Sequence, residues 1–136
     1  MKCIYRNTYL NLGNHYVFLL QMTKRIILIA SGNGSNVENI CGFFEKDQKI
    51  FVVGVYTNNP KAKVIDRVFR FGIKTKVFDK KAFTNGELIS IIKKQKPNLI
   101  VLAGFLWKIG SDWLNEFPCK IINIHPALLP KYGGKG

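Results

Sequence analysis

The sequence is poor in acidic residues: eight Asp and Glu stand against 21 Lys and Arg, which gives a formal net charge of +13. Such a balance favours anionic partners such as phosphates, nucleotides or polyanions, although a generally basic composition would give the same charge. The sequence also lacks an RNA-reading signature and an alternating basic–aromatic tract, so nucleic acid is only a minor alternative as partner.

Cysteine is scarce, and long apolar runs are missing. The three cysteines, Cys3, Cys41 and Cys119, are scattered and odd in number, which fits neither a disulfide framework nor a zinc site. We therefore expect reduced thiols, a cytoplasmic location and no metal. The apolar residues 16–20 are too few for a membrane span or a secretory signal, so we expect no membrane segment. We interpret residues 1–22 as a poorly ordered N-terminal extension and residues 23–136 as one domain.

The domain shows alternating strand and helix patterns. Apolar runs predict five strands at residues 25–30, 50–56, 75–78, 99–103 and 120–124. Helical spacing predicts four helices between them: residues 37–44, a helix starting at Pro60 and stopping at Gly72, a helix capped by Asp79 or Thr84, and a short helix capped by Ser111 or Asp112. This alternation predicts an α/β fold with a doubly wound, mostly parallel, Rossmann-like sheet.

Three loops at the expected carboxyl ends of strands carry candidate chemistry. The first, residues 31–36, has the sequence Ser-Gly-Asn-Gly-Ser-Asn and opens a helix. Its glycines allow close backbone approach, and the free N–H groups of the helix start suit a phosphate. It is neither a Walker loop nor a dinucleotide fingerprint. A purely structural tight turn is the alternative.

The second loop follows the most apolar strand and has the sequence Gly-Phe-Leu-Trp-Lys-Ile at residues 104–109. Its apolar and aromatic side chains could line a slot for a flat heterocycle. Core packing of Phe105, Leu106 and Trp107 is the alternative.

The third loop begins with Asn123 and His125 at the end of the last apolar run. Their spacing of two places both side chains on one face of a strand. Histidine titrates near neutrality and can exchange protons, and an amide N–H can stabilise a developing oxyanion. A catalytic pair and a structural histidine both fit this pattern.

Taken together, the Gly-Asn-Gly-Ser-Asn turn, Ala103-Gly-Phe105 and the Asn-x-His-Pro-x-Leu-Leu-Pro motif from Asn123 to Pro130 resemble the folate-dependent formyltransferases. The resemblance runs from about Thr23 to Gly136. The glycine turn narrows it to the formyltransferases of purine synthesis that act on glycinamide ribonucleotide. The family forms a Rossmann-like α/β fold and transfers a formyl group from N10-formyltetrahydrofolate to the substrate's glycyl amine, without a metal.

The resemblance also implies roles for individual residues. The ribose phosphate and nearby atoms of glycinamide ribonucleotide would be held by Gly34, Ser35, Asn36, Val37 and Glu38. The folate pterin would be wrapped by Leu106, Trp107, Lys108 and Ile109. Asn123 would contact the folate and polarise the formyl carbonyl, and His125 would be the general acid/base.

The chain also departs from the family pattern. Trp107 stands where many relatives have arginine, in a segment whose pterin contacts are largely backbone in character. The family's catalytic aspartate comes well after the His-Pro motif and has no counterpart here. We therefore expect a truncated formyltransferase: the N-terminal two-thirds of the domain, incomplete at the C-terminus, poorly active, with a sheet edge that would favour a homo-oligomer. A non-catalytic phosphate-binding module, or another folate-dependent formyltransferase or hydrolase, is the alternative.

Overall fold

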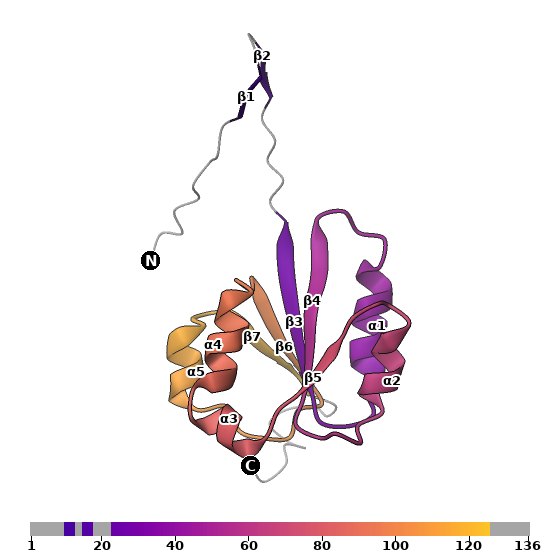
Figure 1. Cartoon of the computed structure of the whole chain (residues 1–136), viewed down its shortest axis with the longest axis vertical. Helices are drawn as coiled ribbons and strands as arrows, with labels where there is room; N and C mark the ends of the chain where they lie inside the picture. Colours follow the sequence, from indigo (N-terminus) through magenta and orange to yellow (C-terminus); the bar gives the residue numbers. More distant parts are fainter. Residues whose placement is uncertain (1–9, 13–14, 18–22, 126–136) are drawn as a thin grey trace.

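The computed structural model describes residues 10–12, 15–17 and 23–125. A central sheet stands between two layers of helices (Figure 1). Its strands are β3 (Lys24–Ala30), β4 (Ile50–Thr57), β5 (Thr75–Val77), β6 (Leu99–Ala103) and β7 (Ile121–Ile124). The helices are α1 (Ser35–Phe44), α2 (Val64–Phe69), α3 (Lys80–Thr84), α4 (Glu87–Lys94) and α5 (Ser111–Glu116). The five predicted strands are confirmed, each to within one residue at either end.

The sheet is wholly parallel, with strand order β5-β4-β3-β6-β7. The chain moves outward from β3 through β4 to β5, then returns to the other side of β3 as β6 and continues to β7. The direction of winding thus reverses between β3 and β6, which is where open α/β sheets bind their ligands. The predicted doubly wound α/β fold is confirmed, and β5 lies at the predicted edge.

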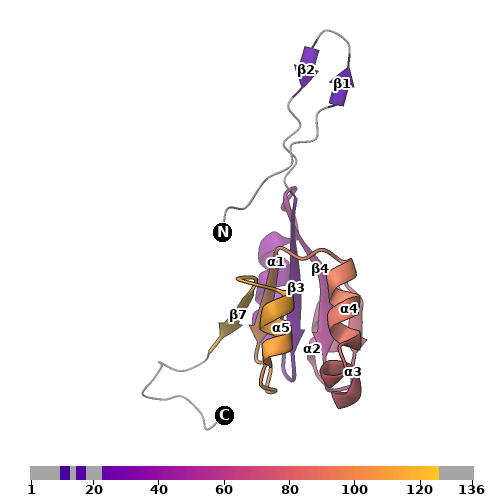
Figure 2. The same ribbon diagram turned by 90° about the vertical axis from the view of Figure 1, so that its left-hand side faces the viewer.

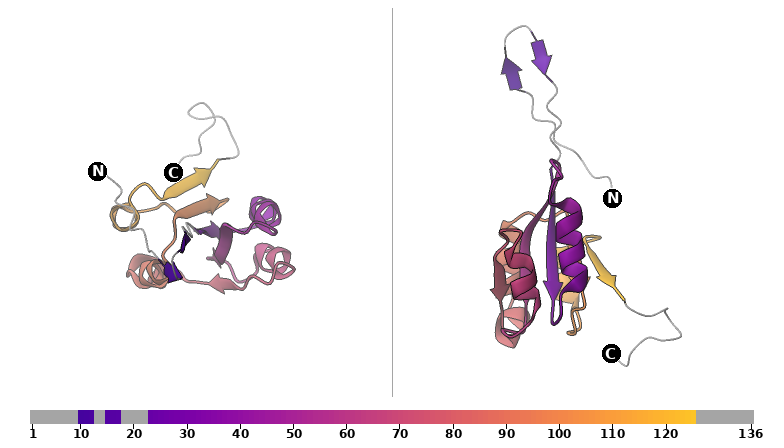
Figure 3. Two further views of the ribbon diagram at one scale, coloured as in Figure 1. Left: turned by 90° about the horizontal axis from the view of Figure 1, so that it is seen from above. Right: turned by 90° about the vertical axis from the view of Figure 1, so that its right-hand side faces the viewer.

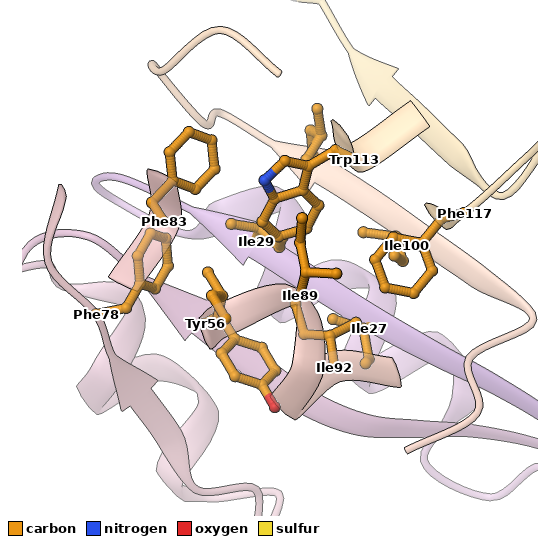
Figure 4. Packing of buried hydrophobic residues seen from close by; sticks show 12 residues of the cluster. Ile27, Ile29, Tyr56, Phe78, Phe83, Ile89, Ile92, Ile100, Trp113 and Phe117 are labelled. Carbon is orange, nitrogen blue, oxygen red and sulfur yellow. The ribbon is translucent and has the colours of Figure 1, made fainter. Parts of the chain in front are cut away.

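Helices α1 and α2 cover one face of the sheet, and α3, α4 and α5 cover the other (Figures 2 and 3). Each face has its own apolar core, because residues of a fully covered strand alternate between the two sides. One core centres on Leu28, Val37 and Val64. The other gathers Ile27, Ile29 and Tyr56 with aromatic and aliphatic side chains from α3, α4 and α5 (Figure 4).

The helix predictions needed three corrections. Pro60 does not start a helix: it lies in a turn, and α2 begins four residues later at Val64. The single helix expected after Asp79 is two helices, α3 and α4, separated at Gly86, whose φ of +84° breaks the helical path. The residue at the N-cap of α5 is Gly110, and neither Ser111 nor Asp112 caps that helix.

A short antiparallel pair lies within the segment interpreted as an extension: β1 (Leu10–Leu12) and β2 (His15–Val17). These strands were not predicted. The rest of residues 1–22 lies outside the described residues, so the poorly ordered extension and the domain boundary at residue 23 stay predictions. Across the described ranges, no helix has the length and apolar character needed to cross a membrane.

Candidate functional site

Two of the three loops are joined directly by Ser31, which follows β3 and is only 7% exposed. The Ser31 N–H donates to the Gly104 carbonyl (3.1 Å), and the Leu106 N–H donates to Ser31 Oγ (3.0 Å). The glycine turn after β3 and the loop after β6 therefore meet at the carboxyl edge of the sheet, at the point where the winding reverses. Since Ser31 and Leu106 are 75 positions apart, sequence reasoning did not find this role for Ser31.

The glycine turn is shaped by its contact with α2. Gly34 is the N-cap of α1 with φ +75°, a left-handed conformation that favours glycine. A Cβ atom at Gly34 would lie 2.5 Å from the Cβ of Val64, and the Val64 N–H donates to the Gly32 carbonyl (3.2 Å). The turn is thus fixed by backbone shape and by close packing on α2.

The residues predicted to hold phosphate lie in the first turn of α1 and differ in their exposure to solvent. Ser35 and Asn36 are exposed, where N–H groups of a helix start lack intrahelical acceptors. Val37 is fully buried in the core beneath α1, so only its backbone could serve a ligand. The Glu38 N–H donates to the Gly34 carbonyl (2.9 Å), which closes the turn.

The Glu38 carboxylate is engaged by two arginines from α2 and its end. Arg67 Nη1 forms an ion pair with Glu38 Oε2, and Arg70 Nη2 lies 3.3 Å from Oε1. Arg67 Nη2 also donates to Asn33 Oδ1 (3.1 Å). Sequence reasoning missed Arg67, because the pairing of two residues 29 positions apart on different helices leaves no local signal.

The turn after β4 borders the glycine turn on the side away from β6. Asn59 Nδ2 donates to the Ser31 carbonyl (3.4 Å), and the Lys61 N–H donates to Asn59 Oδ1 (2.9 Å). A shallow depression there is lined by Gly32, Asn33, Asn59, Lys61, Ala62 and Lys63. Its only charged side chains are two exposed lysines, so it is electropositive.

In the loop after β6, successive side chains alternate between packing against the core and exposure to solvent. Phe105 and Trp107 pack against the aromatic side of the core, with the Trp107 ring centroid 5.3 Å from that of Phe83. Leu106 between them is 82% exposed, and Lys108 is exposed. Lys80 Nζ lies 4.5 Å from the centroid of the Trp107 ring. The core alternative thus holds for Phe105 and Trp107 and is wrong for Leu106.

Strand register brings Asn123 to the same edge of the sheet. β7 pairs with β6, with Asn123 opposite Leu102 and Ile124 opposite Ala103. Asn123 is exposed, and His125, also exposed, follows the strand directly. Both therefore lie beside the start of the loop at Gly104. The remaining motif, residues 126–130, lies outside the described residues.

The first two predicted loops and the described start of the third therefore meet at one edge of the sheet. The glycine turn and the β6 loop are joined by hydrogen bonds, and Asn123 is placed by strand pairing. The polar groups at this edge are side-chain amides, backbone N–H groups, the His125 imidazole and the charged groups of Lys and Arg. No cluster of three or more His, Cys, Asp and Glu side chains suited to a metal occurs among the residues the structure describes.

Comparison with known proteins identifies the family. The formyl transferase family model matches residues 24–136. The phosphoribosylglycinamide formyltransferase of Bacillus subtilis is 36% identical over 117 residues, which cover 82% of this chain and 60% of the relative. That of Escherichia coli is 34% identical over 115 residues, covering 80% and 54%.

Solved structures agree. A phosphoribosylglycinamide formyltransferase from Anaplasma phagocytophilum matches with a TM-score of 0.75 at 30% identity, covering 82% of this chain and 54% of that one. Glycinamide ribonucleotide transformylase 1 from Geobacillus kaustophilus matches with a TM-score of 0.74 at 34% identity, covering 83% and 63%. The chain spans about half to two-thirds of the length of these relatives. The resemblance seen in the sequence is confirmed: the chain belongs to the formyl transferase family.

Proposed function

We propose that this chain carries part of the site for formyl transfer from N10-formyltetrahydrofolate to the glycyl amine of glycinamide ribonucleotide. The observation that carries the proposal is the meeting of the first two loops and Asn123 at one sheet edge, with Ser31 bonded to both Gly104 and Leu106. The relatives from Bacillus subtilis and Escherichia coli bear the names of enzymes with this activity. The chain spans 60% and 54% of those two relatives, so activity, substrates and partners are proposed for it.

The glycine turn is the proposed binding site for the ribose phosphate. Ser35 and Asn36 present side-chain and backbone donors at the start of α1, and Gly34 allows close approach. Val37 contributes its N–H alone, because its side chain is buried.

The proposed folate segment is residues 106–109. Leu106 is exposed while its N–H is fixed on Ser31, so the backbone of this loop is held in place beside an apolar surface. Trp107 and Ile109 are half-buried and pack against the core, so they fix the position of this apolar surface. Lys108 is exposed. Backbone and apolar contacts of this kind suit a flat pterin.

Asn123 and His125 are the proposed catalytic residues. The glycyl amine attacks the formyl carbon, a C–N bond forms, and the carbonyl oxygen becomes negative in a tetrahedral intermediate. The Asn123 amide donates a hydrogen bond to that oxygen. His125 moves the proton released by the amine toward N10 of the folate, and the bond from the formyl carbon to N10 then breaks to release tetrahydrofolate.

We also propose a cytoplasmic location, in keeping with free thiols at Cys41 and Cys119. Association into a homo-oligomer is a further part of the proposal, and the exposed apolar side chain of Ile122 on β7 (49% exposed) supports it. The low activity expected for this chain alone stays a prediction.

Calorimetric titration tests the proposal and separates it from a phosphate-binding module. The chain is titrated with glycinamide ribonucleotide, and then with a non-reactive analogue of N10-formyltetrahydrofolate. We expect both to bind at once. In a chain completed to the length of the relatives, His125→Ala should leave the affinity for ribonucleotide within about twofold while lowering formyl transfer about 10²-fold or more. Binding of the ribonucleotide without a folate site would favour the module. Binding of neither would overturn the proposal.

A further inference from the structure

Arg67 touches the glycine turn at both of its ends. One guanidinium nitrogen bonds the carboxylate of Glu38, in the first turn of α1. The other donates to the side chain of Asn33, which precedes Gly34 (3.1 Å). The planar guanidinium can span two acceptors in a fixed geometry, which an ammonium group cannot do. Arg67 thus connects the entry and the exit of the turn that we propose holds phosphate.

Glu38 is an unfavourable residue at such a place unless its charge is compensated. A carboxylate in the first turn of a helix suits the helix dipole but opposes a second anion bound there. Its side chain is only 21% exposed, and Arg67 and Arg70 contact its two oxygens. Two positive charges thus contact one negative charge, so the Glu38 carboxylate is compensated at the turn.

The family resemblance implies that Glu38 helps to hold the substrate, and its own contacts limit how its carboxylate could do so. Its carboxylate oxygens already accept from α2, and its N–H is bonded to Gly34. We infer that Arg67 is a positioning residue that holds the Asn33–Glu38 turn in shape and neutralises Glu38, and so makes the site selective for the phosphorylated form of the substrate. This inference rests on the proposed function and adds a residue on α2 that governs it.

Paired ligands test the inference, because only one of them carries the phosphate. Affinities for glycinamide ribonucleotide and for the unphosphorylated glycinamide riboside are measured by calorimetry for the 136-residue chain and its variants. We expect Arg67→Ala to weaken ribonucleotide binding about tenfold and riboside binding less than about twofold, in line with the loss of a charge-assisted contact. Arg67→Lys should recover part of the loss, since it keeps the charge and loses the second bond.

A second substitution separates charge from simple loss of structure. Glu38→Gln removes the carboxylate's charge, so in the Arg67→Ala background it should restore several-fold of the lost ribonucleotide affinity. Lys46→Ala is the control: it removes one positive charge from an exposed position beyond the far end of α1 and should change neither affinity. Equal weakening of both ligands by Arg67→Ala, or no change in either, would overturn the inference.

Amide hydrogen exchange without ligand supplies a readout that does not depend on binding. Arg67→Ala should speed exchange at Glu38, whose N–H is bonded to the Gly34 carbonyl, and Lys46→Ala should not. Wild-type protein that binds neither ligand would overturn the proposed function along with the selectivity inferred here. Wild-type protein that prefers the ribonucleotide, with the same preference retained in Arg67→Ala, would overturn the role of Arg67 alone.

Discussion

Gly34 and Val64 approach so closely that a Cβ atom at position 34 would lie 2.5 Å from the Cβ of Val64 and 2.7 Å from its Cα. The start of α1 and the start of α2 are thus in contact at a residue with no side chain. Glycine is needed at position 34 for two reasons: a side chain would clash with Val64, and a φ of +75° is unfavourable for other residues.

Gly34→Ala should therefore lower the free energy of unfolding by about 2–4 kcal/mol, from backbone strain and from displacement of α2. Urea denaturation measures the change. Gly32→Ala is the matched control, since a Cβ atom at position 32 would meet nothing within 4 Å and the φ of Gly32 is not in the left-handed region. An equal loss at both glycines would show that the contact with Val64 is not what matters.

Ser31→Ala should lower the free energy of unfolding by about 1–3 kcal/mol, because it leaves the partly buried Leu106 N–H without its acceptor. The loss should come with faster amide exchange at Leu106. Ser90→Ala serves as control: that hydroxyl bonds the Gly86 carbonyl on an exposed face of α4, and its removal should change stability by less than about 0.5 kcal/mol. Unchanged exchange at Leu106 in Ser31→Ala would contradict the link between the two loops.

Local patterns sufficed for the strands and for the order of the candidate loops. β6 is bounded by Pro97-Asn98 and Gly104, and its residues 99–103 are all apolar, so its limits follow from sequence. The split between α3 and α4 was missed because Leu88, Ile91 and Ile92 have the spacing of one apolar helical face, which was assigned to the same helix as the Asp79 cap. Glycine in a helical pattern is tolerated often enough that the left-handed φ of Gly86 could not be foreseen.

The contacts that shape the candidate site, unlike the strands, do not follow from local sequence patterns. Arg67 with Glu38 and Ser31 with Leu106 join residues 29 and 75 positions apart, so they depend on how the elements pack. The sequence pointed to the turn and the strand end, since both are local motifs. The apolar spacing of residues 37, 40, 43 and 44 predicted the buried face of α1, which Val37 confirms. It could not show that Phe43 is 81% exposed, because that depends on how α1 packs on the sheet.

Asp79 is the predicted cap that the structure confirms: its carboxylate accepts from the Ala82 N–H (2.8 Å) at the start of α3. Asp79→Ala should cost about 0.5–2 kcal/mol by urea denaturation, and Asp79→Asn should retain most of the stability. α5 offers the control, because Asp112 lies in its first turn without a capping bond. Asp112→Ala should cost less than Asp79→Ala, and the reverse order would contradict the capping role.

Cys41 should make stability fall at high pH. Burial, with a smaller effect of nearby Glu38, raises the pKa of the Cys41 thiol from 9.0 to about 11. The unfolded chain loses this proton near pH 9 while the folded chain retains it, so the contribution is complete below pH 9 and is lost as pH rises to about 11. The full loss corresponds to roughly 2–3 kcal/mol.

Urea denaturation at about pH 7, 9 and 10.5, compared with Cys41→Ala, isolates this contribution from the lysines and tyrosines that titrate in the same range. The variant should show a shallower fall above about pH 9 than the wild type. Alkylation followed by peptide mapping gives a second measure, since exposed Cys119 should react well before buried Cys41. Equal slopes together with equal alkylation rates would contradict the burial of the thiol.

Asn123→Asp tests the proposed oxyanion donor with almost no change in size. The exposed position at the end of β7 should tolerate the change, so unfolding free energy should move by less than about 0.5 kcal/mol. In a chain completed to the length of the relatives, formyl transfer should fall by about 10²–10³-fold, because a carboxylate cannot donate to the negative oxygen and repels it. The affinity for glycinamide ribonucleotide should stay within about twofold, since we propose that its phosphate binds at the start of α1. A loss of ribonucleotide affinity as large as the loss of turnover would instead make Asn123 a substrate-binding residue, and the amide that stabilises the intermediate would have to be sought elsewhere.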